Sequence, residues 1–173
     1  MKKILETKRI YLREMTEEDY EDLCDILQDT ETMYAYEHGF SDDEVEEWLN
    51  KQFHRYKQFE FGLWAVIDKE TQCFVGQAGL TIQCVEGKEE IEIGYLLKKK
   101  YWHRGYATEA AIACRDYAFN YLDRDRVISI IRDNNYSSQQ VAKRVGMTKE
   151  GELVKHYYNI EMPHYVYAIE KNK

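Results

Sequence analysis

One short stretch of the chain carries the residue types that bind a phosphate group. Tyr101–Thr108 (YWHRGYAT) joins a strand-like apolar run to a segment with helical periodicity, and Gly105 lies at the junction. A helix N-terminus presents unpaired N–H groups and about half a positive charge, which suits an anion such as a pyrophosphate. Glycine lets the backbone approach that anion closely. A strand–glycine–helix turn is also an ordinary connection, so the spacing alone leaves both interpretations open.

Three side chains near this turn are candidates for acid–base or nucleophilic chemistry. Glu92 lies on the strand that leads to the turn, where it is either a general base or a sheet carboxylate paired with a neighbouring strand. Glu109 already has a structural reason to be in the first turn of a helix. Cys114 lies on a stripe of small residues with no base beside it, which favours a core residue over a nucleophile.

Apolar periodicity and capping signals predict the elements that position these residues. Thr16–Asp19 and Ser41–Glu44 have the form of capping boxes, each followed by an apolar helical stripe. Helices are predicted from 16 and from 41 to about 57, then at 107–121 and 138–145. Strands are predicted at 10–13, 63–67, 74–82, 91–97, 127–131, 148–154 and 162–169. Gly94 is expected to mark a bulge or a close backbone approach.

The order β-α-α-β-β-β-α-β-α-β-β predicts an α/β domain with a mixed sheet. The strands at 91–97 and 127–131 are joined by a helical crossover, which requires them to be parallel neighbours. The chain has 173 residues without a Pro/Gly/Ser-rich linker, so we expect one domain over 1–173.

Composition excludes several classes of protein. No run approaches the roughly 18 apolar residues of a membrane helix, and Met1–Glu6 does not resemble a signal peptide, so we expect a cytoplasmic protein without a membrane partner. The four cysteines form no C-x-x-C pair, so no metal site or disulfide is indicated and mostly buried thiols are expected.

Charge and missing motifs exclude further classes. A net charge of −8 disfavours binding to nucleic acid and favours encounter with a cationic acceptor. Neither G-x-G-x-x-G nor the P-loop occurs, which weakens a dehydrogenase or nucleotide hydrolase.

Two stretches resemble the signatures of one enzyme family. Tyr95–Leu97 (YLL) followed by YWHRGYATEA resembles the acetyl-coenzyme A motif of GNAT N-acetyltransferases, in particular the branch that acetylates N-termini of ribosomal proteins. Asn135–Met147 (NYSSQQVAKRVGM) resembles that branch's second signature, Asn-x-x-Ser followed by Gly and an apolar residue. Similarities at 6–13 and 146–151 extend the resemblance over nearly the whole chain.

The resemblance implies the GNAT acyl-coenzyme A N-acyltransferase fold and direct transfer of acetyl from acetyl-coenzyme A to a primary amine. The expected amine is a protein N-terminal α-amine or a small cationic amine, and the expected oligomeric state is a monomer or homodimer. A noncatalytic acyl-coenzyme A-binding regulatory module remains the alternative. Aromatic residues that either line the acceptor side or belong to the core are Tyr36, Trp48, Tyr157 and Tyr158.

Cofactor contacts are also implied by the resemblance. The pantetheine arm is expected between a bulged antiparallel strand and the next, parallel strand, with backbone partners at Leu96 and Leu97 and a further contact at Asn135. Lys143 or Arg144 is expected near the nucleotide end. Amide contacts with the pyrophosphate are implied for His103, Arg104, Gly105, Tyr106, Ala107 and Thr108.

The remaining candidate site residues are positions where this sequence matches the two family signatures or departs from them. Ser138 matches the serine of the second signature, which makes it either the acid that protonates the thiolate or a helix cap. Many family members use a tyrosine seven residues after the Asn, where this chain has Ala142. Trp102 replaces the Gln or Arg that usually begins the first motif. His103 replaces a common Gly, which indicates either a pH-sensitive phosphate contact or a tolerated loop residue, and no catalytic role.

Overall fold

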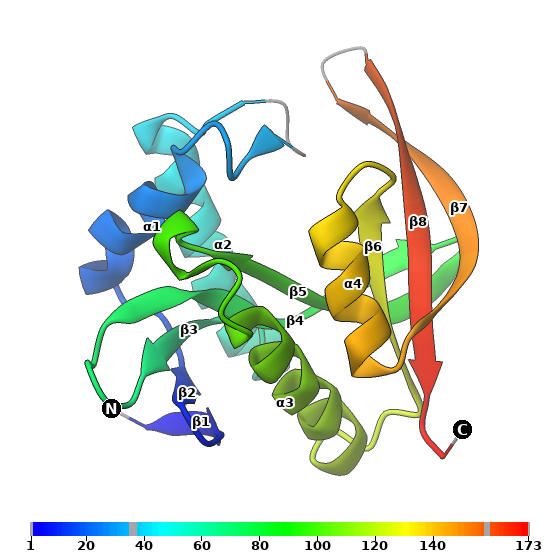
Figure 1. The fold of residues 1–173 in the computed structure, drawn as a ribbon, viewed down its shortest axis with the longest axis horizontal. Helices are drawn as coiled ribbons and strands as arrows, with labels where there is room; N and C mark the ends of the chain where they lie inside the picture. Colours follow the sequence, from blue (N-terminus) through cyan, green and yellow to red (C-terminus); the bar gives the residue numbers. More distant parts are fainter. Residues whose placement is uncertain (1, 35–37, 158–159, 173) are drawn as a thin grey trace.

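The computed structural model describes residues 2–34, 38–157 and 160–172, which form one sheet flanked by helices (Figure 1). The strands are β1 (Lys3–Glu6), β2 (Ile10–Arg13), β3 (Leu63–Asp68), β4 (Phe74–Val85), β5 (Lys88–Leu97), β6 (Arg126–Arg132), β7 (Thr148–Tyr157) and β8 (Ile160–Glu170). The helices are α1 (Tyr20–Leu27), α2 (Asp42–Phe59), α3 (Tyr106–Asn120) and α4 (Tyr136–Val145), with short 3-10 turns η1 (Glu17–Asp19) and η3 (Lys99–Tyr101).

The sheet is mixed, as the sequence predicts. Its strand order is β1-β2-β3-β4-β5-β6-β8-β7, with β5 and β6 parallel and the other neighbouring pairs antiparallel. The predicted order of elements is correct apart from β1, which the sequence analysis missed. This strand has four residues at the edge of the sheet and no fully buried side chain, so it lacks the alternation that identifies a strand.

Both predicted capping boxes are present. Ser41 accepts from the amide of Glu44 at 3.2 Å, and the Glu44 carboxylate accepts from the amide of Ser41 at 3.1 Å. Asp19 accepts in the same way from the amide of Thr16, at 2.8 Å, before the turn that leads into α1. These bonds satisfy backbone donors that would otherwise be orphaned at the helix starts.

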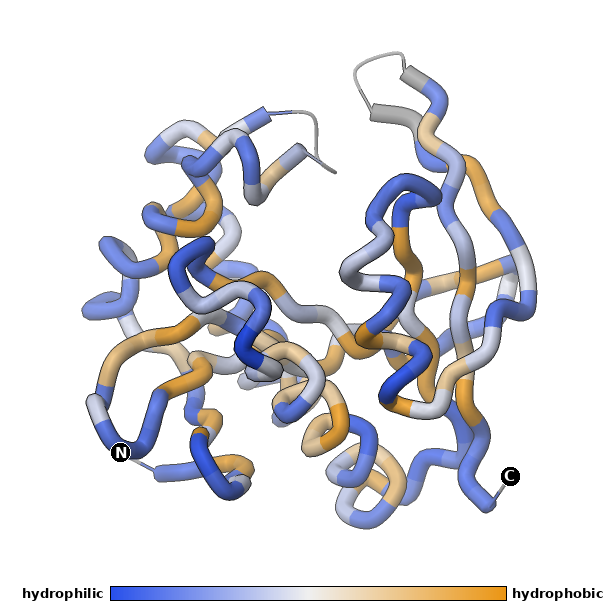
Figure 2. The backbone as a smooth tube through the Cα atoms, in the orientation of Figure 1, coloured by the Kyte–Doolittle hydropathy of each residue, from blue (hydrophilic) through white to orange (hydrophobic). Residues whose placement is uncertain are grey.

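Two cores lie on opposite faces of the sheet. Along β3, Trp64 and Val66 join the core under α3, whereas Leu63, Ala65 and Ile67 join the core under α1 and α2, because successive strand residues face opposite sides. Hydrophobic residues in Figure 2 accordingly recur along β3, β5 and α3, where these elements meet. Four residues of the predicted stripe of small residues on α3 are fully or almost fully buried: Ala110, Ala111, Cys114 and Ala118. The fifth, Ala107, is only partly buried because it lies at the start of the helix, at a cavity wall.

The strands β5 and β6 separate toward their carboxyl ends (Figure 1). The two strands pair only at Glu92 and Ile128, and beyond this point they are joined by side-chain hydrogen bonds in place of backbone pairing. Ser129 Oγ donates to the carbonyl of Ile93 at 2.9 Å, and the amide of Ile130 donates to Glu92 Oε2 at 2.8 Å. These side-chain bonds hold the strands together at the base of an open cleft.

The predicted bulge in β5 is wrong. The register between β4 and β5 runs without a shift from Gly76 opposite Leu97 to Val85 opposite Lys88. A Cβ added at Gly94 would meet its nearest neighbour at an ordinary 3.5 Å, so a close backbone approach is not present either. The cleft therefore opens because β6 leaves the ladder, while β5 remains regular.

The expectation of mostly buried thiols is correct for Cys114 and wrong for Cys73 and Cys84, which are exposed. Both exposed cysteines lie near strand ends, where the apolar pattern used for the prediction carries little weight. Across the described ranges no helix is long and apolar enough to cross a membrane.

Candidate active site

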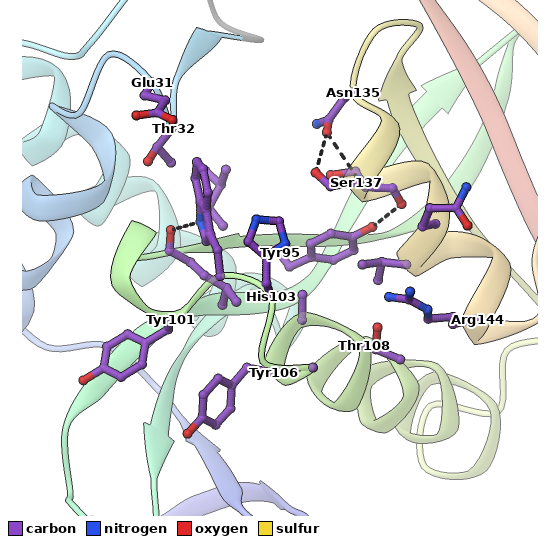
Figure 3. Close-up of a pocket in the computed structure, with 18 of the residues that line it drawn as sticks. Glu31, Thr32, Tyr95, Tyr101, His103, Tyr106, Thr108, Asn135, Ser137 and Arg144 are labelled. Carbon is purple, nitrogen blue, oxygen red and sulfur yellow. Dashed lines mark hydrogen bonds between the residues drawn. The ribbon is translucent and has the colours of Figure 1, made fainter.

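A cavity of about 460 Å³ opens between β5, the turn after it and α4 (Figure 3). Of the residues predicted to bind the cofactor, nine line it: Leu96, Leu97, His103, Gly105, Tyr106, Ala107, Thr108, Asn135 and Ser138. Arg104 and Lys143 are exposed and do not line it. Of the two cations considered for the nucleotide end, Arg144 is the one that projects from α4 into the cavity.

The turn into α3 has the geometry of an anion-binding site. Gly105 is the N-cap, with φ 82° and ψ 2°, and no side chain caps the helix. The first helical bond runs from the amide of Glu109 to the carbonyl of Gly105 at 3.0 Å. The amides of Tyr106, Ala107 and Thr108 therefore have no partner within the helix, and they lie at the cavity wall. Three free amides at a positive helix end fit the pyrophosphate of coenzyme A.

Arg9, which the sequence analysis did not single out, braces this turn from behind. Its Nε donates to Glu109 Oε1 at 2.7 Å, its Nη1 donates to the carbonyl of Arg104 at 2.9 Å, and its guanidinium lies 4.4 Å from the centre of the Tyr106 ring. Burial alone would raise the pKa of Glu109, but hydrogen bonds from Thr7 and Arg9 outweigh it and lower that pKa. Glu109 is thus a structural carboxylate. Its partners lie about a hundred positions earlier in the chain, which no local sequence signal reveals.

The alternation of the β4–β5 ladder determines which backbone groups of β5 face the cleft. The amide of Lys98 donates to the carbonyl of Val75 across this ladder, so the backbone groups of Leu96, two residues earlier, also face β4. Those of Tyr95 and Leu97 point toward the open side, and the Leu97 carbonyl accepts there from Trp102 Nε1 at 3.1 Å. This alternation argues against the expected backbone contact at Leu96. The side chain of Leu96 still lines the cavity.

A second cavity of about 340 Å³ continues from the first between α2, β5, β6 and the β7–β8 pair. Residues that line both cavities are Thr32, Tyr95, Leu96, Asn135 and Ser138. Trp48 lines the second cavity, as considered for the acceptor side. Tyr36, Tyr158 and the side chain of Tyr157 lie outside the described residues.

Glu92 faces the second cavity and also joins two strands of the sheet. One carboxylate oxygen accepts from the amide of Ile130, so the residue does join two strands. The carboxylate also lines the cavity. Burial raises the pKa of Glu92, against the opposing effects of the Ile130 amide and the charges of Lys155 and Arg55. A carboxylate with a raised pKa in a cavity is suited to accept a proton near neutral pH.

Asn135 at the start of α4 and Tyr95 on β5, both labelled in Figure 3, each form a hydrogen bond with the backbone of Ser138. Asn135 is the N-cap and its Oδ1 accepts from the amide of Ser138 at 3.3 Å, so the capping interpretation of Ser138 is wrong. The Tyr95 hydroxyl donates to the carbonyl of Ser138 at 2.9 Å. Burial raises the pKa of Tyr95, which keeps this hydroxyl protonated. Tyr95 occupies the junction of the cavities, a position that depends on the separation of β5 from α4 and is not encoded locally.

Comparison with known proteins agrees with this geometry. Residues 9–148 match the family model described as an acetyltransferase (GNAT) domain. The chain is 36% identical over 144 residues to the uncharacterized protein YkkB of Bacillus subtilis, covering 83% of this chain and 84% of that protein. A GNAT-family acetyltransferase structure from Bacillus anthracis superposes with a TM-score of 0.82 at 26% identity, covering 96% and 97% of the two chains.

A more distant structure shares the fold. RimL, a ribosomal α-N-protein acetyltransferase in complex with coenzyme A, superposes with a TM-score of 0.80 at 16% identity and covers 98% of each chain. The matching family model spans most of the sequence and includes the turn at Gly105, the cleft between β5 and β6, and α4. This chain therefore belongs to the GNAT family of acetyltransferases.

Proposed function

We propose that this acetyltransferase transfers acetyl from acetyl-coenzyme A directly to a primary amine, with both substrates bound at once. The observation that carries this proposal is the meeting of two cavities at Tyr95, Leu96 and Ser138. One cavity leads to the anion-binding turn and the other contains Glu92. Two substrates held in line across such a junction need no covalent enzyme intermediate, and their alignment supplies much of the acceleration.

Cofactor binding in this proposal uses the first cavity. Bound acetyl-coenzyme A supplies an activated thioester. The amides of Tyr106, Ala107 and Thr108 hold the pyrophosphate, and Arg144 contributes a positive charge beside it. Tyr95 and Leu97 present backbone groups to the pantetheine arm along the open side of β5.

Proton transfer uses the second cavity and its junction with the first. Glu92 takes the proton from the attacking amine, directly or through a water. The Tyr95 amide faces the cleft and stabilises the negative charge that develops on the acetyl oxygen. Ser138 lines both cavities, and its side chain forms a hydrogen bond with Tyr95 that opposes the rise in the pKa of Tyr95. The Ser138 hydroxyl is positioned to return a proton to the departing thiolate.

The pKa of the acceptor amine determines the free energy required to deprotonate it at pH 7. A lysine-like amine near pKa 10.4 requires about 4.6 kcal/mol to become neutral at pH 7, whereas an α-amine near 7.7–8.0 requires roughly 1–1.4 kcal/mol. A carboxylate base with a raised pKa is sufficient for the second class. We therefore propose an α-amine or another amine of low pKa as the acceptor.

The direct test combines calorimetric titration of acetyl-coenzyme A with thiol release in the presence of α-amine peptides, amino acids and polyamines. Saturable binding with release on at least one amine supports the proposal. Binding without release across the panel would favour the noncatalytic acyl-coenzyme A-binding module. Absence of binding would show that the turn at Gly105 is not a phosphate site.

A further inference from the structure

The second cavity has a charge opposite to that of the whole protein. The chain carries a net charge of −8, yet the charged side chains that line the described part of this cavity comprise four cations and one carboxylate: Lys51, Arg55, Arg132, Lys155 and Glu92. His164 also faces the cavity, and burial lowers the pKa of its imidazole, which favours the neutral form. The cations come from α2, β6 and β7, so only the tertiary structure assembles them.

Lys51 and Lys155 are the cations best placed to bind an anion, because both arginines have other partners. Arg55 donates to Gln52 Oε1 at 3.1 Å, and Arg132 donates to the carbonyl of Tyr34 at 3.0 Å. No acidic side chain among the described residues forms an ion pair with Lys51 or Lys155. Lys155 is partly buried on β7, and Lys51 is exposed at the cavity mouth on α2.

The electrostatic environment of Lys51 is consistent with a site for an anion. Partial desolvation and the neighbouring charge of Arg55 both lower the pKa of Lys51. An anion bound beside Lys51 would offset both effects. A polyamine would meet like charges from both sides of the cavity, which is unfavourable.

A buried amide donor supplies an independent indication. Gln77 is fully buried and lines the same cavity, and its Oε1 accepts from Trp48 Nε1 at 3.0 Å. This bond fixes which end of the amide is oxygen, because an indole N–H can only donate. Gln77 Nε2 then has no hydrogen-bond partner among the described residues. An unsatisfied buried donor at a cavity wall requires an acceptor, such as a carboxylate or phosphate oxygen.

We propose that the acceptor is a small amine that also carries a carboxylate or phosphate group. This inference rests on the proposed acetyl transfer and specifies its substrate class. The anionic group binds Lys155 and Lys51 while the amine faces Glu92 at the junction with the first cavity. The amine nitrogen bonds to the acetyl carbon, the C–S bond breaks, Glu92 takes the amine proton, and the thiolate leaves with the electron pair. The cavity volume of about 340 Å³ suits an acceptor of roughly dipeptide size.

The test compares acceptors that differ only in the anionic group, using thiol release from acetyl-coenzyme A. One pair is the dipeptide amide Ala-Asp-NH2 and its neutral analogue Ala-Asn-NH2, in which the anionic group is remote from the α-amine. The second pair is O-phosphoethanolamine and ethanolamine, and spermidine is the cationic member. We expect kcat/KM to be at least about tenfold higher for the anionic member of at least one pair, as one charge-assisted contact provides. The pair with the largest ratio distinguishes carboxylate from phosphate.

Variants locate the effect at the proposed site. Lys155→Met should lower the ratio of kcat/KM between the preferred anionic acceptor and its neutral partner about tenfold, and Lys155→Arg should restore this ratio. Any effect of the lost charge on the pKa of Glu92 acts on both acceptors and cancels in the ratio. Lys57→Met removes an exposed lysine from the same helix as Lys51 and should change neither rate. Equal rates within every pair, or preference for spermidine, would overturn the inference and leave acetyl transfer standing. No release with any amine would overturn the proposed function and the inference with it.

Discussion

At the scale of single residues, the proposed chemistry depends most on Glu92. Its carboxylate lines the acceptor cavity and accepts from the amide of Ile130 at 2.8 Å, while burial raises its pKa. The bond from Ile130 fixes the orientation of one oxygen, and the side chain of Thr81 also forms a hydrogen bond with the carboxylate. The raised pKa makes the carboxylate a stronger base than an exposed glutamate.

Replacing this base should slow the reaction without changing the fold. In Glu92→Gln the side-chain oxygen can still accept from Ile130, but the base is lost. We expect kcat/KM to fall about 100-fold. In the native protein the rate should rise with pH through the raised pKa of Glu92, and this limb should disappear in the variant. Glu90→Gln is the matched control, since Glu90 lies on the same face of β5 but pairs with Arg126 at 2.9 Å. Similar rates and pH profiles for both variants would exclude Glu92 as the base.

The same substitution should affect stability in a pH-dependent direction. Because the folded-state pKa of Glu92 is raised, folding favours its protonated form, and this contribution to stability is lost as pH rises through that pKa. Glu92→Gln should therefore gain stability relative to the native protein as pH increases. Urea unfolding at pH 5 and pH 8 measures this difference. A constant or decreasing difference would show that the carboxylate is not disfavoured by burial.

At the scale of elements, the junction between β5 and α3 forms the proposed phosphate site. Gly105 has φ 82°, and Arg9 ties the turn to the beginning of the chain through Glu109 and the carbonyl of Arg104. This bracing holds the first-turn amides of α3 in place before a ligand binds. A preorganised turn loses less entropy when the anion arrives.

Alanine substitutions at two glycines with similar backbone conformations distinguish the effect of backbone strain from loss of the proposed phosphate site. Gly105→Ala places a Cβ 3.3 Å from Arg9 Nη2 in a left-handed backbone conformation. We expect about 1 kcal/mol of lost stability and at least about tenfold weaker binding of acetyl-coenzyme A by calorimetry, roughly 1.4 kcal/mol. Gly87→Ala is the control, because Gly87 has φ 78° with no atom near the added Cβ and lies in the turn before β5. Equal affinities for the two variants would argue against a phosphate site at the α3 terminus.

At the scale of the molecule, the cleft divides the sheet into two parts that a bound cofactor would join. One side comprises β1–β5 with α1, α2 and α3, and the other comprises β6–β8 with α4 (Figure 1). Beyond Glu92 and Ile128 these parts are connected by side-chain bonds such as that from Tyr95 to the carbonyl of Ser138. A ligand in the cleft would contact both.

Cofactor binding should therefore stabilise the whole fold. At about 100 times the dissociation constant, coenzyme A should add about 2.7 kcal/mol. For a chain of this size that corresponds to a rise in Tm of roughly 5–10 °C. Thermal unfolding with and without coenzyme A measures the shift, and Gly105→Ala should show a smaller one at equal concentration. An identical shift in that variant would mean that the ligand binds elsewhere.

Local signals in the sequence determined the helices and strands and the turn at Gly105 that is proposed to bind phosphate. Capping boxes at Thr16 and Ser41, the small-residue stripe of α3 and the glycine before it are readable because each depends on neighbours within a few positions. The resemblance to GNAT motifs added the identity of the family. Both kinds of information are contained in contiguous residues.

The tertiary structure alone decided how the two cavities are built. The regular β4–β5 register directed the backbone groups of Leu96 toward β4, and the departure of β6 opened the cleft without the expected bulge. Lys51 and Lys155, more than a hundred residues apart in the chain, both line the second cavity and contribute to its positive charge within an acidic protein. Net charge sums over the whole chain, whereas recognition depends on the few side chains that folding brings to one surface.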